Sequence, residues 1–257
     1  MSPRPKILAH RGLNRVAPEN TIPAFQAGME RHVDGFELDV QFTKDRRMVV
    51  IHDFQVGRTA RRRRSQRAQG GEPEPRIRDL TRAELDEYEA GSFFQADFAG
   101  TPVPDLEQVL DLVGDQVLLN LEVKSLDLDG HEPLELLVDL LRSRQLMKQV
   151  IVSSFNPIVL MKLRWLDPGI PLGLIFRRNL PAYLERAWLS PLIAPEALHP
   201  HISLVDYDFV QRAHDQGYMV NVWTVNEPED ARRLAAWGVD AIVTDDPELI
   251  RRALDDA

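Results

Sequence analysis

The chain has 257 residues and no cysteine, which excludes disulfide bonds and thiolate metal sites. It also lacks any apolar run approaching the roughly 18 residues needed to cross a bilayer. Its first residues lead into a predicted strand without the hydrophobic stretch of a signal peptide. Acids outnumber bases, and the net charge of −9 argues against general nucleic-acid binding. These absences predict a cytoplasmic protein with no stable membrane anchor and no nucleic-acid partner, and they leave the oligomeric state open.

One segment, residues 58–67, is strongly basic although the chain as a whole carries a net negative charge. We expect it to be a solvated, mobile loop; the alternative is a patch that attracts an anionic substrate or a membrane surface. Lysine, by contrast, is scarce: the chain has five, so Lys124 inside a predicted strand is unusual. The basic segment, residues 58–67, holds six arginines and no acid: Arg58, Arg61, Arg62, Arg63, Arg64 and Arg67.

Short apolar segments alternate with amphipathic helical ones almost throughout the chain. Helix starts are marked by Thr21, Asp105, Asn156 and Asn226, and a helix end by Gly238. Repeated strand–helix units in a chain of this length favour an α/β fold, the closed (β/α)8 TIM barrel, over an open doubly wound sheet. We expect residues 1–257 to form one such domain. The predicted strands are residues 7–11, 35–40, 48–52, 117–123, 150–155, 172–176, 197–201, 220–225 and 241–244.

Nine strands are predicted for the eight places of a barrel. The weakest is 197–201, which Pro195 and Pro200 interrupt. The link from Val40 to Met48 is too short for a helix, so these segments join through a plain loop or pair as a hairpin. Residues 54–104 form an insertion after the third strand, including a predicted helix at 81–89. Because loops that follow barrel strands lie on the catalytic face, we expect this insertion to cover the site.

Three acids at predicted strands indicate a metal site. Glu37 and Asp39 are two residues apart on a strand, so their side chains point to the same side, and Glu122 is a third acid on another strand. Such an oxygen-rich site suits Mg²⁺, Ca²⁺ or Mn²⁺ rather than zinc. The alternative is a buried salt-bridge network with Arg11 and Lys124.

Two histidines favour the metal interpretation. His10 and His52 each end a predicted strand, where barrel catalysis occurs, and imidazole suits proton transfer near neutral pH. Arg11 and Lys124 add positive charge without being metal ligands. This combination suits a phosphodiester substrate, whose anionic oxygens the cations hold while one histidine activates the attacker and the other protonates the leaving alkoxide.

Short motifs that join these residues occur along the chain. They are His-Arg-Gly at 10–12, Pro-Glu-Asn-Thr at 18–21, Glu-Leu-Asp-Val at 37–40, His-Asp at 52–53, Glu-Val-Lys at 122–124, Trp-Thr-Val-Asn at 223–226 and Thr-Asp-Asp-Pro at 244–247. With these motifs the sequence resembles the glycerophosphodiester phosphodiesterases, in their compact bacterial cytosolic form. The resemblance runs from residue 6 to about residue 254.

The resemblance implies one divalent cation, Mg²⁺ or Ca²⁺ with Mn²⁺ as a further candidate, held by Glu37, Asp39 and Glu122. It implies that His10 and His52 form the acid–base pair. We assign His10 as the base and His52 as the acid, with the reverse assignment left open. The attacker is either water or the glycerol 2-hydroxyl of the substrate, the latter through a cyclic phosphate.

Further residues receive roles from the same resemblance. Arg11 and Lys124 would contact phosphate, and Phe155 and Trp223 would line the pocket for the glycerol backbone. Asp53 would orient the preceding histidine or touch glycerol.

The segment around the first helix and the arginine-rich segment are less regular. We expect Asn20 and Thr21 to cap the helix that follows, whereas the role of Glu19 is left unassigned. Arg58 and Thr59 keep the Arg-Thr pair that follows His-Asp in this family, but the arginine run after them departs from the family pattern. Substrate preference is therefore less firmly predicted than the reaction.

The predicted function is hydrolysis of glycerophosphodiesters, the deacylated phospholipid headgroups, to sn-glycerol 3-phosphate and an alcohol. One alternative is a lysophospholipase D or a phosphoinositide-type phospholipase C, with Phe93, Phe94 and Phe98 forming a rim for the acyl chain. Another is a non-catalytic anion-binding module that uses the arginine-rich segment.

Overall fold

Eight parallel strands close into a barrel. The computed structural model describes residues 4–63, 74–125, 132–185 and 187–256. The strands follow the order β1-β11-β10-β9-β8-β7-β6-β2, and β1 pairs with β2 to complete the circle. The predicted TIM barrel is therefore confirmed. The strands are β1 (Lys6–His10), β2 (Gly35–Phe42), β6 (Leu118–Val123), β7 (Val150–Ser154), β8 (Leu172–Phe176), β9 (Ala197–Pro200), β10 (Met219–Val222) and β11 (Ala241–Thr244).

The ninth strand of the same sheet, β3 (Met48–Val50), lies outside the barrel and pairs antiparallel with β2. The segment between Val40 and Met48 therefore belongs to a β-hairpin, which is one of the two arrangements that the sequence left open. The weakest prediction, 197–201, is the barrel strand β9. Pro200 is tolerated because it is the last residue of that strand, where the ladder continues through the amide of His201 to the carbonyl of Phe176 at 2.9 Å.

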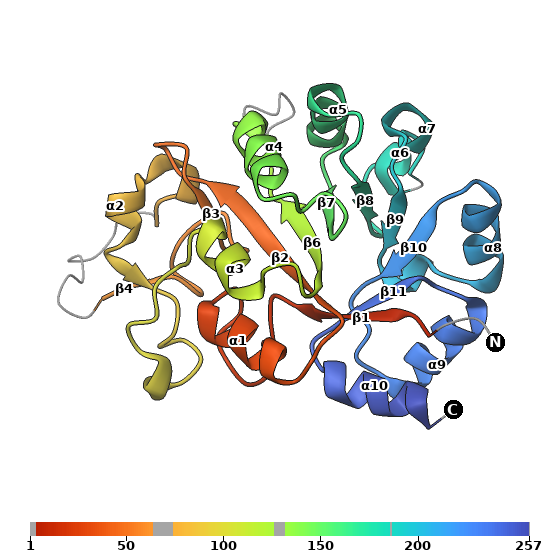
Figure 1. The fold of residues 1–257 in the computed structure, drawn as a ribbon, viewed down its shortest axis with the longest axis horizontal. Coiled ribbons are helices and arrows are strands. Elements are labelled where there is room, and N and C mark those ends of the chain that lie inside the picture. The colour runs from red at the N-terminus through yellow and green to blue at the C-terminus, as the bar shows by residue number, and fades with distance from the viewer. Residues whose placement is uncertain (1–3, 64–73, 126–131, 186, 257) are drawn as a thin grey trace.

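The helices lie around the outside of the strands (Figure 1). Asn156 accepts a hydrogen bond from the amide of Ile158, and Gly238 ends its helix with φ +88°, both as predicted. The helix predicted to start at Asn226 begins instead at Pro228. The longer helices are α1 (Ile22–Glu30), α3 (Leu106–Val113), α4 (Leu134–Ser143), α5 (Pro157–Leu166), α8 (Tyr207–Asp215), α9 (Pro228–Trp237) and α10 (Pro247–Asp255), with the short α6 (Ala182–Glu185), η4 (Ile202–Leu204) and α7 (Ser190–Ile193) between them.

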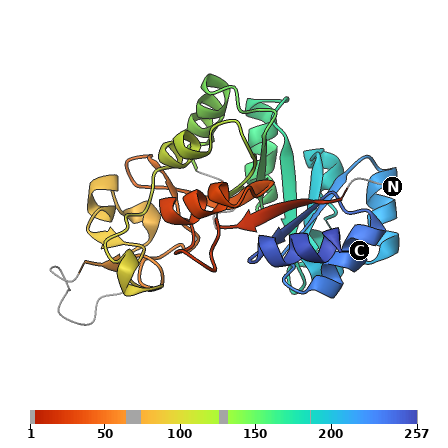
Figure 2. The ribbon, with the colours of Figure 1, turned by 60° about the horizontal axis from the view of Figure 1, so that its bottom comes forward.

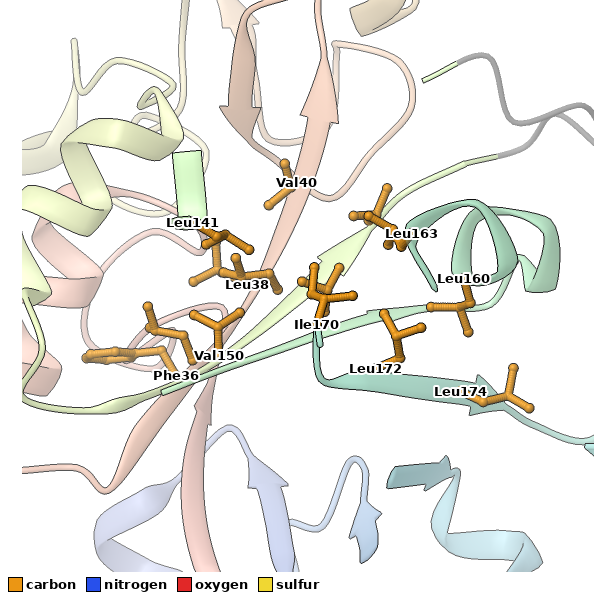
Figure 3. Packing of buried hydrophobic residues seen from close by; sticks show 14 of the residues in the cluster. Phe36, Leu38, Val40, Leu141, Val150, Leu160, Leu163, Ile170, Leu172 and Leu174 are labelled. Atoms are coloured by element: carbon orange, nitrogen blue, oxygen red, sulfur yellow. The ribbon is translucent and has the colours of Figure 1, made fainter. Parts of the chain in front are cut away.

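Strand β2 shows how the barrel separates core from site. Its alternate residues Phe36, Leu38 and Val40 are buried in the same hydrophobic cluster as Leu141 of α4 and Leu163 of α5 (Figure 3). Successive side chains of a strand point to opposite faces, so the residues between them point into the barrel. The helix packing thereby fixes the inward direction of the acids on β2.

The insertion between β3 and α3 builds a small unit beside the barrel (Figure 2). It has its own hydrophobic cluster, which includes Ile77, Leu85 and Tyr88. The helix predicted at 81–89 is shorter, because the chain after Leu85 turns and then pairs as a strand. The elements are β4 (Arg61–Arg62), η2 (Ile77–Asp79), α2 (Arg82–Leu85), β5 (Tyr88–Glu89) and η3 (Ala96–Phe98).

Arg58, Arg61 and Arg62 of the basic segment are exposed, in agreement with the predicted solvated loop, but the segment also makes ordered contacts with protein groups. Arg61 and Arg62 form β4, which pairs with β5, and the Arg62 guanidinium lies 5.4 Å from the Tyr88 ring centre. Arg63 donates to the backbone carbonyl of Asp86 at 3.1 Å. Arg64 and Arg67 lie outside the described residues. Within the described ranges, none of the helices has the length and apolar character needed to span a membrane.

Candidate active site

A cleft of about 740 Å³ opens where the strands end. The residues assigned roles by sequence lie at the carboxyl ends of several strands, so the barrel brings together side chains far apart in the chain. Of the ten predicted site residues, Asp39 and Asp53 do not line the cleft. Those that do are His10, Arg11, Glu37, His52, Glu122, Lys124, Phe155 and Trp223.

The three predicted metal ligands converge. Asp39 on β2 stands beside Glu122 on β6 in the ladder, and Glu37 is two residues earlier on β2. One carboxylate oxygen from each of the three lies within 4.8 Å of the others, and all three side chains are buried. Burial, together with the charges of the other two acids, raises the pKa of Glu37 well above its usual value.

Two cations lie against this acidic group. The Lys124 ammonium is 2.8 Å from Glu122 Oε1 and 3.5 Å from Asp39 Oδ1. The Arg11 Nε atom is 3.3 Å from Asp39 Oδ2. Burial alone would raise the pKa of Asp39, but Lys124 and Arg11 outweigh it, so the pKa of Asp39 is lowered. Asp39 is therefore ionised at neutral pH.

The acids fit a hard divalent cation. Asp39 Oδ1 is buried and has no hydrogen-bond partner. Burying an anionic oxygen in this way is costly unless a cation completes its surroundings. Because the three donors are all carboxylates, Mg²⁺, Ca²⁺ and Mn²⁺ match them better than softer metals do.

Each predicted catalytic histidine is hydrogen-bonded to a carboxylate through its Nδ1 atom. His10 Nδ1 is 2.6 Å from Asp245 Oδ1, and His52 Nδ1 is 2.8 Å from Asp53 Oδ1. A carboxylate accepts a hydrogen bond from Nδ1–H and so keeps this proton on Nδ1, which leaves Nε2 as the atom that exchanges protons. His10 Nε2 lies 3.8 Å from Glu37 Oε2, so this atom faces the acidic group.

Aromatic rings form one wall of the cleft. The rings of Phe155 and Trp223 meet edge to face with centroids 5.6 Å apart, and His201 meets Trp223 in the same manner at 5.1 Å. The Trp223 Nε1–H donates to the backbone carbonyl of His199 at 2.8 Å, which fixes the indole plane. Burial lowers the pKa of His199 to about 3, so this ring is neutral at physiological pH.

The sequence profile of the glycerophosphoryl diester phosphodiesterase family matches residues 10–249. The chain belongs to this family. A glycerophosphodiester phosphodiesterase of Caldanaerobacter subterraneus subsp. tengcongensis is 36% identical over 247 residues, which are 95% of each chain. Another, from Bacillus altitudinis, is 30% identical over 247 residues, again 95% of each chain. The resemblance found in the sequence is thereby confirmed.

A solved structure supports the same assignment. The Oleispira antarctica phosphodiesterase in complex with the product sn-glycerol-3-phosphate aligns with a TM-score of 0.84 at 27% identity, over 98% of this chain and 97% of that chain. The present chain therefore shares its barrel fold with this solved phosphodiesterase.

Asn20 contacts a proposed metal ligand, a role that was not predicted from the sequence. Asn20 was predicted to cap α1, yet its amide donates to Asp39 Oδ2 at 2.8 Å. Thr21 occupies the cap position, but its hydroxyl donates to the carbonyl of Pro18 and not to the helix. The Pro-Glu-Asn-Thr motif marks the segment, whereas the partner of Asn20 depends on the pairing of β1 with β2.

Asp245 is a second missed residue. Besides His10, it accepts hydrogen bonds from the side-chain amides of Asn14 at 2.6 Å and Asn226 at 2.7 Å. The Thr-Asp-Asp-Pro motif was the available signal. Three donors converge on one carboxylate, so Asp245 holds the His10 ring in place and connects β11 to β1.

We expect Asp245 to make folding sensitive to acid. Burial alone would raise its pKa, but hydrogen bonds from His10, Asn14 and Asn226 lower it. A carboxylate with a lowered pKa stabilises the fold at pH values above its unfolded pKa, about 3.9, and that stabilisation is lost as pH falls below this value. In chemical unfolding experiments the stability difference between the wild type and Asp245→Asn should therefore shrink between pH 6 and pH 2.5. A difference that stays constant over this range would contradict the assignment.

Proposed function

We propose that this phosphodiesterase hydrolyses glycerophosphodiesters, the deacylated phospholipid headgroups, to sn-glycerol 3-phosphate and an alcohol. The observation that carries the proposal is the convergence, in one cleft, of three buried carboxylates, two histidines backed by carboxylates, and two cations. The product named for the Oleispira antarctica phosphodiesterase supports the same substrate class.

In this proposal Glu37, Asp39 and Glu122 hold one divalent cation, with Mg²⁺ or Ca²⁺ as the first candidates and Mn²⁺ as a third. When bound, the ion supplies positive charge that stabilises the developing negative charge on phosphate oxygens. The fit rests on the donor set and on Asp39 Oδ1, which is buried and accepts no hydrogen bond although the Lys124 ammonium lies 3.5 Å away.

The other side chains of the site are proposed to bind the phosphate and to transfer protons. Arg11 and Lys124 bind the anionic phosphate oxygens, and their contacts with Asp39 keep both side chains directed at the cleft. His10 accepts a proton from the attacking hydroxyl at Nε2, while Asp245 holds the proton on Nδ1. His52 acts in its imidazolium form, with one proton on Nδ1 toward Asp53 and one on Nε2. It gives the Nε2 proton to the departing alkoxide as the phosphorus–oxygen bond breaks, which yields the free alcohol and the neutral ring.

The glycerol part is proposed to lie against Phe155 and Trp223, whose rings offer an apolar wall at one side of the cleft. The cleft volume of about 740 Å³ is in the range of sites for drug-sized ligands, so room remains for the leaving alcohol. The alternative with an acylated lipid is less well supported, because Phe93, Phe94 and Phe98 are not among the residues that line the cleft.

An assay across headgroups tests the proposal. Turnover of glycerophosphocholine, glycerophosphoethanolamine and a lysophospholipid is compared with Mg²⁺, Ca²⁺ and Mn²⁺ in parallel. We expect turnover of the deacylated diesters and little of the lysophospholipid. Faster turnover of the lysophospholipid would overturn the substrate assignment. Detection of a cyclic glycerophosphate under single turnover identifies the 2-hydroxyl as the attacker, and its absence identifies water.

A further inference from the structure

Arg58, the first arginine of the basic segment, forms ion pairs with two acids at the rim of the cleft. Its Nε is 2.5 Å from Asp53 Oδ2, and one terminal nitrogen is 2.9 Å from Asp53 Oδ1, so the guanidinium grips this carboxylate with two bonds. The same terminal nitrogen lies 2.7 Å from Glu19 Oε1, and the other is 3.3 Å from Glu19 Oε2. The guanidinium is therefore shared between the insertion and the segment after β1.

Each of these acids contacts a different proposed catalytic group. Asp53 Oδ1 accepts from His52 Nδ1 at 2.8 Å. Glu19 Oε1 accepts from the Arg11 guanidinium at 2.9 Å. A continuous series of charged contacts thus runs from the proposed general acid His52 through Arg58 to the proposed phosphate-binding Arg11. Arg58 and Asp53 belong to the segment between β3 and α3, whereas Glu19 belongs to the segment after β1, so the Arg58–Glu19 ion pair joins two segments that are far apart in the chain.

The charges show why an arginine is needed. Without Arg58, the carboxylates of Asp53 and Glu19 would be held near each other with no common cation. Burial alone would raise the pKa of both acids, yet hydrogen bonds and ion pairs, in which Arg58 takes part, lower it. A lysine retains the charge but lacks the planar group that binds one carboxylate with two parallel bonds while reaching a second.

We propose that Arg58 is a positioning residue for catalysis: it fixes Asp53 against His52 and Glu19 against Arg11, and so makes the insertion set the geometry of the reacting groups. The inference rests on the proposed function for the roles of His52 and Arg11. It assigns the beginning of the arginine-rich segment an internal task in place of an outward anion-binding one.

A double-mutant cycle tests the link to His52. Arg58→Gln should lower kcat by roughly 10–100-fold, as loss of a group that orients a catalytic residue commonly does, with little change in KM. In a His52→Ala background the same substitution should cost clearly less, because one of the two groups that it positions is gone and only its effect through Glu19 and Arg11 remains. An equal loss in both backgrounds would overturn the positioning of His52 by Arg58.

Conservative and remote variants separate positioning from charge and from folding. Arg58→Lys should be nearly as slow as Arg58→Gln, whereas wild-type activity in this variant would mean that charge alone suffices. Arg233→Gln, which removes an exposed ion pair with Asp230 on α9, is the matched control and should keep full activity. All variants should keep the circular dichroism spectrum of the wild type.

A spectroscopic measurement tests the proposal without turnover. In ¹⁵N-labelled protein, the His52 ring signals, assigned by their loss in His52→Ala, should show the proton on Nδ1. Arg58→Gln should shift these signals toward the mixture of tautomers seen for a free imidazole. Unchanged His52 signals would overturn the positioning role even if the protein hydrolysed some other substrate. An inactive wild type with shifted signals would instead count against the proposed function alone.

Discussion

Glu37→Gln is expected to abolish metal-dependent hydrolysis while the barrel stays folded. Glutamine has nearly the volume of glutamate, so the packing of β2 is preserved, but it removes one of three anionic ligands. A bound metal contributes several kcal/mol to transition-state stabilisation, so we expect kcat/KM to fall by roughly 10³-fold or more. The measurement is steady-state turnover of glycerophosphocholine across a titration of Ca²⁺ or Mg²⁺.

The fold of this variant should be at least as stable as that of the wild type when metal is removed. Burial and the neighbouring carboxylates raise the pKa of Glu37, so its ionised form is unfavourable in the metal-free site, and a neutral amide relieves that strain. Glu30→Gln at the exposed end of α1 is the matched control and should be fully active. Full activity of Glu37→Gln would show that the acidic triad does not serve as a metal site in catalysis.

His10→Ala and His52→Ala should each lower kcat by roughly 10²–10⁴-fold on natural diesters, the range typical of general acid–base groups. The two variants should differ on a glycerophosphodiester with 4-nitrophenol as the leaving alcohol. This alcohol departs without protonation, so the loss in His52→Ala should become small, whereas the loss in His10→Ala should persist.

The neutral core histidine provides a comparison for these variants. His199→Gln removes a buried imidazole whose Nε2 lies 2.9 Å from the side-chain amide of Asn221 and has no role in proton transfer in this proposal, so its effect should not depend on the leaving alcohol. If His10→Ala recovered on the activated substrate and His52→Ala did not, the acid and the base would be reversed. Equal behaviour of both variants on both substrates would contradict separate roles.

Much of the site was predictable because local pattern and barrel geometry agree. Alternation along β2 directs Glu37 and Asp39 inward, and parallel pairing with β6 sets Glu122 beside Asp39. His10 was predicted for a related reason, because the barrel strand β1 ends at the face where the loops meet. His52 was predicted by the same rule, but it follows β3 outside the barrel, which pairs antiparallel with β2. The inward direction of the acids and the position of His10 follow from the two-residue alternation of side chains along a strand and from the common direction of parallel strands, and both can be inferred from a single sequence.

The supporting contacts were not predictable because they depend on closure of the barrel. Asp245 lies 235 positions from His10 in the chain and meets it only because β11 pairs with β1. Asn20 contacts Asp39 rather than its own helix because β1, which precedes Asn20, pairs with β2, which carries Asp39. Arg58 had the appearance of a solvated residue, since its neighbours are arginines, and its two acidic partners come from separate segments.

The most direct test of the account follows phosphorus in a single reaction. Metal-stripped protein is mixed with glycerophosphocholine, and ³¹P NMR spectra are recorded before and after Mg²⁺ or Ca²⁺ is added. We expect no turnover without the ion, and with the ion the conversion of the diester signal to that of sn-glycerol 3-phosphate. Equal turnover in the metal-free sample, or the appearance of phosphocholine and glycerol, would contradict the proposal.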